Sequence, residues 1–146
     1  MRWWTQASGV PFRDRGRDPS GWDCWGLVHW HYARLRFTDL PDRPEVSALD
    51  LLAVANSAVE GLSKGPWERI DGLGEPLDLV IVWRHYEAWA SGLMIAAPIH
   101  CGLVTMPGFI LHCDEDTGTV VTRFAPEPHA SLRSRRFDLY RYRAMP

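Results

Sequence analysis

The sequence predicts an α+β fold, an antiparallel sheet covered on one side by N-terminal helices. Apolar residues recur at helical spacing in the first half of the chain. β-branched and aromatic runs bounded by Gly, Pro and Asp fill the second half. This order of elements is typical of α+β proteins. With 146 residues, 46% of them hydrophobic, the chain is expected to form a single domain over 1–146.

Residues 3–37 predict a short helix, a turn, a loop and then a long helix. Residues 3–8 could form a short helix that ends at the turn of Gly9-Val10-Pro11. A loop rich in charge, Gly and Pro follows over 12–21. The next segment, 23–37, predicts a long helix because five residues at helical spacing would share one face, namely Cys24, Leu27, Val28, His31 and Leu35.

A second helix is predicted from the pair Ser47 and Asp50, which is typical of a helix N-terminus, to Gly61. Strands are expected after it, at 67–70, 77–83, 99–105, 109–113, 119–124 and 137–142. Pro107-Gly108 and Asp116-Thr117-Gly118 have the composition of hairpin turns. We therefore expect neighbouring strands of the second half to pair in antiparallel fashion.

Composition excludes several classes of partner. The net charge of −2 gives no argument for a nucleic-acid partner. The longest apolar stretch, 92–99, is too short for a membrane span, and the first residues lack the apolar region of a signal peptide. Three cysteines without regular spacing do not suggest a disulfide framework. We expect synthesis in a reducing cytoplasm and no cofactor.

The most informative run is Ser20-Gly21-Trp22-Asp23-Cys24-Trp25-Gly26-Leu27-Val28. It places Cys24 at the expected start of a helix, where the helix dipole favours the nucleophilic thiolate. His100 and His112 follow on two successive strand-like runs. A cysteine followed much later by a histidine and then a further polar residue is the chain order of a papain-like triad.

Together these motifs resemble the NlpC/P60 superfamily of cell-wall cysteine peptidases. The resemblance rests on Gly9-Val10-Pro11-Phe12, Asp23-Cys24-Trp25-Gly26-Leu27, Glu75-Pro76-Leu77-Asp78-Leu79-Val80, His100-Cys101-Gly102-Leu103 and Phe109-Ile110-Leu111-His112. It implies a papain-like fold with the nucleophile at a helix N-terminus. The variant Gly-Trp-Asp-Cys-Trp-Gly-Leu is similar to the phage, prophage and gene-transfer-agent tail-assembly branch.

The resemblance implies a role for each site residue. Cys24 would be the nucleophile, His100 the general base and His112 the residue that orients His100. We place Phe12, Trp22, Asp23 and Trp25 in the substrate-binding part, with Asp23 also supporting the helix start. Many family members have a tyrosine twelve residues before the nucleophile, where its hydroxyl helps to stabilise the oxyanion. Phe12 occupies that position here and has no such donor.

The family resemblance further implies a peptidoglycan stem peptide as substrate, cut between γ-D-glutamate and the following diamino acid. It also implies phage tail proteins as partners and a location in the virion tail. Two alternatives remain open: a structural tail component with weak or no activity, and a thiol acyltransferase of the same architecture. Zinc binding is not expected, because no pair of cysteines or histidines has metal-ligand spacing.

Two further expectations concern the strands. Strand alternation predicts that Cys101 and Cys113 point to the face opposite their histidine neighbours and pack in the core. Residues 84–98 form an apolar insertion between two strands. This insertion could line a substrate groove, contact a tail protein or fold over its own core, and its apolar side chains are Tyr86, Trp89, Leu93, Met94 and Ile95.

Overall fold

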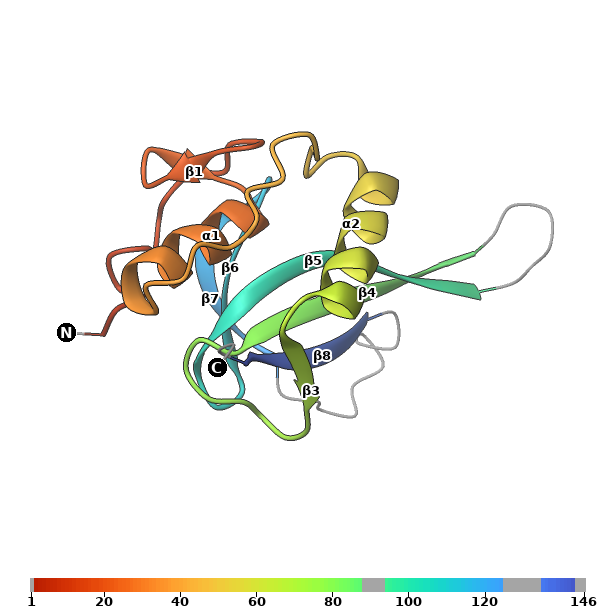
Figure 1. Ribbon diagram of the computed structural model, residues 1–146. Coiled ribbons are helices and arrows are strands. Elements are labelled where there is room, and N and C mark those ends of the chain that lie inside the picture. Colours follow the sequence, from red (N-terminus) through yellow and green to blue (C-terminus); the bar gives the residue numbers. More distant parts are fainter. Residues whose placement is uncertain (1, 88–93, 125–134, 144–146) are drawn as a thin grey trace.

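The computed structural model describes residues 2–87, 94–124 and 135–143, and over these it has the predicted α+β architecture (Figure 1). Its main sheet has six strands in the order β3-β8-β4-β5-β6-β7, and every neighbouring pair is antiparallel. The strands are β3 (Trp67–Ile70), β4 (Leu79–Glu87), β5 (Met94–Met106), β6 (Phe109–Asp114), β7 (Gly118–Arg123) and β8 (Arg135–Tyr142). A separate two-stranded hairpin, β1 (Arg17–Asp18) with β2 (Gly21–Trp22), precedes the first helix.

The first helix, α1, spans Cys24–Leu35 and begins one residue later than predicted. Asp23 lies before it as the N-cap, so the cysteine is the first helical residue. The second helix, α2, spans Leu51–Lys64 and continues past Gly61, where the sequence predicted its end. The N-cap of α2 is Asp50. Ser47, the other residue of the predicted pair, does not cap the helix, because its hydroxyl donates to Asp14 Oδ2 at 2.6 Å.

The predicted helix over residues 3–8 is wrong. The segment forms consecutive turns, in which the N–H groups of Thr5 and Ala7 donate to the carbonyls three residues earlier. The segment then joins the sheet, because the N–H of Gly9 donates to Thr119 O and the N–H of Thr119 donates to Val10 O, both at 2.9 Å. The pairing of Gly9 and Val10 with Thr119 leaves only the six residues 3–8 before the sheet, too few for a stable helix.

The two faces of the sheet bury separate clusters. One cluster, beneath the helices, contains the buried face of α1 with Ile81, Cys101, Leu103, Leu111 and Cys113, and Leu62 of α2 packs against it. The opposite face contains Val80, Val82, Val104, Ile110, Phe124 and Leu139. Helix α1 contacts β5 and β6, and α2 contacts β5 (Figure 1). Both helices therefore lie on one face, as predicted.

The predicted insertion over 84–98 is an extension of two strands. Strands β4 and β5 remain paired out to Glu87 and Met94, and they project from the body of the molecule as a hairpin arm (Figure 1). Residues 88–93 lie outside the described part of the chain. A groove-lining role of this segment would depend on five apolar side chains that are also outside it, those of Tyr86, Trp89, Leu93, Met94 and Ile95. No helix among the described residues is long and apolar enough to cross a bilayer.

Candidate active site

Cys24 lies where the first turn of α1 meets the sheet. Asp23 Oδ1 accepts the N–H of Gly26 at 2.8 Å, which fixes the start of the helix at the cysteine. The Gly26 position admits no side chain, because a Cβ there would lie 2.0 Å from Gly16 O. The aspartate and glycine of the Asp-Cys-x-Gly motif therefore position the thiol at the positive end of the helix dipole.

A second glycine, Gly102, plays the same part on the histidine side. A Cβ at this position would lie 2.5 Å from Leu111 O, on the neighbouring strand β6. Strands β5 and β6 can therefore approach closely only with glycine here. This close approach brings the strand that carries His100 against the strand that carries His112, so the His-x-Gly motif also has a packing explanation.

The two histidines are in direct contact. His100 Nε2 and His112 Nδ1 are 2.8 Å apart, and His112 Nε2 lies 3.0 Å from Thr122 Oγ1. When His112 donates its Nε2 proton to Thr122, its Nδ1 accepts the Nε2 proton of His100. His100 Nδ1 is then the ring nitrogen left to take a proton from Cys24. The sequence predicted this order of contacts, and the structure brings the histidines together.

The Cys24 sulfur is surrounded by groups that favour a thiolate. Hydrogen bonding from the Cys101 thiol, and next from His100, holds the pKa of Cys24 well below its ordinary value, although burial opposes this. The backbone N–H of Cys101 acts in the same direction. The side chain is 8% exposed. The site thus combines a thiol whose pKa is lowered with a nearby base, the two groups that nucleophilic catalysis needs.

The orientation of Cys101 corrects the prediction that this residue points away from the site. Cys101 lies on the sheet face that α1 covers, so strand alternation directs it toward Cys24. His100 can nevertheless reach Cys24, because the pairing of β4 with β5 skips Ile99 immediately before it. Such a bulge changes the direction of the next side chain. Cys113 is fully buried, as predicted, and its thiol donates to Trp22 O at 3.3 Å.

The buried carboxylate of Asp23 links the nucleophile to two charged segments. Its Oδ2 accepts the N–H of Arg15 at 2.9 Å, and its Oδ1 lies 3.0 Å from Nη1 of Arg17. Arg17 also bonds Asp42 at 2.6 Å. Burial raises the pKa of Asp23, and the nearby Cys24 adds to this, while Arg17 opposes it. Arg17 and Asp42 were not singled out in the sequence, where they lie in charged loops without a motif.

A groove of about 310 Å³ opens beside Cys24. Cys24, Cys101 and His100 line one side of it, and α2 supplies an opposite wall that contains Val54, Ala58 and Leu62. Sequence analysis gave no functional role to α2. The only signal was its amphipathic pattern, which is more often a sign of packing.

The four predicted substrate-binding residues separate into two pairs. Asp23 and Trp25 line the groove, and the indole N–H of Trp25 donates to Pro41 O at 2.8 Å. Trp22 is 1% exposed and donates to Thr119 Oγ1 at 2.8 Å, so it belongs to the core. Phe12 pairs with Trp22 in an isolated bridge and packs against the same core. Neither residue lines the groove.

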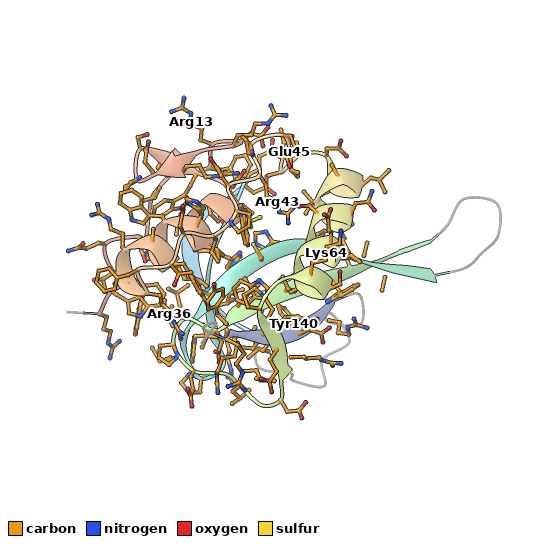
Figure 2. All side chains as sticks on the ribbon, in the orientation of Figure 1. Arg13, Arg36, Arg43, Glu45, Lys64 and Tyr140 are labelled. Atoms are coloured by element: carbon orange, nitrogen blue, oxygen red, sulfur yellow. The ribbon has the colours of Figure 1, made fainter. Side chains whose placement is uncertain are left out.

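Arg43 is a groove residue that the sequence did not indicate. Its backbone has φ of 56°, a left-handed conformation that is strained for a residue other than glycine. Its guanidinium lies beside α2 (Figure 2), and Nη2 would be 3.6 Å from a Cβ added at Gly61. Among the described residues no acidic group pairs with this guanidinium, which is therefore available to an anionic ligand.

Comparison with solved structures identifies the architecture. The crystal structure of the NlpC/p60 domain of the peptidoglycan hydrolase SagA is similar, with a TM-score of 0.51, 18% sequence identity and 92% of each chain covered. The chain has the NlpC/p60 fold. No protein-family model and no curated protein matches the sequence. The predicted α+β class and papain-like topology are confirmed by this likeness.

Proposed function

We propose that the protein is a cysteine peptidase that hydrolyses stem-peptide amide bonds of peptidoglycan. The observation that carries the proposal is the geometry of the site, in which Cys24 begins a helix beside His100, and His100 is itself bonded to His112 at 2.8 Å. The NlpC/p60 domain of SagA, which has a similar fold, belongs to a peptidoglycan hydrolase. Residues and fold thus agree on the reaction class.

The reaction would proceed in two steps. The Cys24 thiolate attacks the amide carbonyl, and His100 donates a proton to the leaving amine, which gives an acyl-enzyme. Water, deprotonated by His100, then releases the acid. The first N–H groups of α1 have no acceptor within the helix, and Asp23 takes that of Gly26, which leaves those of Cys24 and Trp25 for a developing oxyanion. They are the donors that this site would use in place of the hydroxyl that Phe12 lacks.

One groove residue, Arg43, supports a substrate with a free carboxylate. A peptide bond made through the γ-carboxyl of glutamate leaves the α-carboxylate free near the scissile carbonyl. The guanidinium of Arg43, which lies on the groove that holds Cys24 and has no acidic partner in the described part of the chain, could bind such a group. We therefore include the γ-D-glutamyl–diamino acid bond in the proposal. The Trp-Asp-Cys-Trp-Gly-Leu motif supports a phage-tail location, with tail proteins as partners.

The test combines thiol labelling with digestion of muropeptides. Iodoacetamide should label Cys24 well before Cys101 and Cys113, and labelling should remain fast below about pH 8.5, the ordinary thiol pKa. Mass spectrometry of digested muropeptides should show new amine and acid ends. Cys24→Ala and His100→Ala should abolish these products. His112→Ala should slow their formation less, and His112→Asn should retain more activity than alanine, because an amide can still bond the ring of His100.

Two variants serve as controls. Cys113→Ala removes a buried thiol outside the groove, and His29→Ala removes a histidine on α1 that lies near Asp39. Both should keep the products. Equal labelling of the three cysteines, or full activity in His100→Ala, would contradict the proposal. Products joined to an added amine, without free acid, would instead identify an acyltransferase.

A further inference from the structure

Cys101 is a second thiol in the groove, and the proposed hydrolysis does not use it. It follows His100 directly on β5 and is 7% exposed, close to the 8% of Cys24. Both cysteines line the groove and belong to the same buried cluster. Both are free thiols. A reagent that enters the groove can therefore meet both sulfur atoms.

The two sulfur atoms differ in protonation. Cys101 directs two donors, its thiol and its backbone N–H, at the Cys24 sulfur. This bonding and burial raise the pKa of Cys101 well above its ordinary value. Of the two thiols, Cys24 is therefore the one that loses its proton more readily. A reactive thiolate beside a resolving thiol is the arrangement found at reversible oxidation sites.

We propose that Cys24 and Cys101 form an oxidation site that hydroperoxides convert to a disulfide. In the first step the Cys24 thiolate attacks the outer oxygen of the hydroperoxide. The O–O bond breaks, the alkoxide or hydroxide leaves, and Cys24 becomes a sulfenic acid. In the second step the Cys101 sulfur attacks the Cys24 sulfur. The S–O bond breaks, the S–S bond forms, and the thiol proton leaves with the hydroxyl group as water.

The disulfide would protect the nucleophile from irreversible oxidation. Sulfenic acid that finds no thiol is oxidised further to sulfinic and sulfonic acids, which ordinary thiols cannot reduce. The disulfide can be reopened by a dithiol, which supplies two electrons. If the proposed function holds, the peptidase would be switched off by peroxide and restored by reduction. The oxidation chemistry itself does not depend on that function.

Cys113 provides a matched control within the same fold. It is buried beneath the same helix, but its thiol is bonded to Trp22 O. Burial raises its pKa, so it should neither react first nor resolve the sulfenic acid. A disulfide that contains Cys113 would not follow from the contacts described above.

The experiment maps the crosslink in the full chain. Reduced wild-type protein is freed of reductant, treated with hydrogen peroxide, blocked with N-ethylmaleimide and digested without reduction. Trypsin releases Cys24 within residues 18–34, but it leaves Cys101 and Cys113 together within residues 85–123. Chymotrypsin, or the Cys113→Ala variant, therefore completes the assignment. We expect a Cys24–Cys101 crosslink in wild type and in Cys113→Ala.

Two variants of the resolving residue sharpen the result. Cys101→Ser keeps a hydrogen-bond donor but has no thiol, and Cys101→Ala removes both. In each variant peroxide should carry Cys24 to the sulfinic and sulfonic acids, and dithiothreitol should not restore its labelling by iodoacetamide. In wild type most of this labelling should return after reduction.

Either of two results would overturn the proposal. In the first, Cys24 is oxidised to the sulfinic acid at the same peroxide dose in the wild type and in Cys101→Ser. In the second, the crosslink contains Cys113. The wild-type measurement decides the matter even if a Cys101 variant fails to fold. Because the readouts are thiol masses, absence of peptidase activity would leave this proposal standing, and activity without a crosslink would overturn this proposal alone.

Discussion

The two helices that border the groove begin alike and are held in very different ways. Each has an aspartate N-cap, Asp23 for α1 and Asp50 for α2. Helix α1 has six buried residues, and its cap is 2% exposed. Among the described residues of α2 none is fully buried, and its cap is exposed. The helix that carries the nucleophile is thus fixed by packing, whereas the opposite wall rests on partial contacts.

This difference has a physical consequence for the site. A nucleophile must keep its distance to the base, so a rigid support is useful for it. A groove wall that packs loosely can adjust to a ligand at low cost in free energy. Contacts of α2 with the sheet are made mainly through β5. We infer that α1 and α2 will respond differently to equivalent substitutions, which can be measured.

The largest difference is expected between Leu27→Ala in α1 and Leu52→Ala in α2. Leu27 is 0% exposed, so its truncation should lower the free energy of unfolding by about 2–5 kcal/mol. Leu52 is 73% exposed, and its truncation should change that free energy by about 0.5 kcal/mol or less. Urea denaturation of both variants measures the two values. Similar losses would contradict the unequal packing of the helices.

A smaller difference is expected between the caps. Asp23→Ala removes the cap and leaves Arg17, whose side chain is 18% exposed, with Asp42 as its remaining ion-pair partner. We expect a loss of about 2–3 kcal/mol in the free energy of unfolding, from the cap and the partly buried pair together. Asp50→Ala should cost about 0.5–1 kcal/mol, the usual value of an exposed cap. Thermal and urea unfolding measure both.

The conservative variant separates the two roles of Asp23. Asn at position 23 can still accept the N–H of Gly26, but it loses the charge that pairs with Arg17 and the second oxygen that accepts the N–H of Arg15. Asp23→Asn should therefore lose less stability than Asp23→Ala. If both variants lose the same free energy of unfolding, capping contributes little here. If only Asp23→Ala loses stability, the ion pair with Arg17 contributes little.

These contrasts also explain which features the sequence could predict. The nucleophile motif was predictable because its residues are neighbours in sequence. Asp23 caps the helix and Gly26 allows close packing, and both effects are local. All six expected strands and both long helices are present, because their sequence patterns agree with their burial. The contact between His100 and His112 followed from one hairpin, and its 2.8 Å distance agrees with that expectation.

The missed features depend on contacts between distant segments. The presence of both Cys101 and His100 beside Cys24 could not be predicted. It depends on which face of the sheet α1 covers and on the bulge at Ile99 that redirects His100. Arg43 is conspicuous only through its backbone φ and its place beside α2. The segment over 3–8 has helix-compatible residues, but the pairing of the next two residues, Gly9 and Val10, with β7 decides where the chain goes. Tertiary contacts thus determined what local pattern could not.

The smallest effect is expected for Phe12→Tyr, which adds a hydroxyl on the nucleophile side. A well-placed oxyanion donor contributes on the order of 2.7–4 kcal/mol to the transition state. Phe12 does not line the groove, and the backbone N–H groups at the start of α1 are the donors proposed for the oxyanion. We therefore expect kcat/KM on a stem-peptide amide to change by at most about tenfold.

Ala58→Ser, which adds a hydroxyl on the α2 wall, is the matched control and should change kcat/KM less. A gain of about a hundredfold in Phe12→Tyr alone would mean that the natural site lacks a donor. The protein would then be better described as a weakly active tail component.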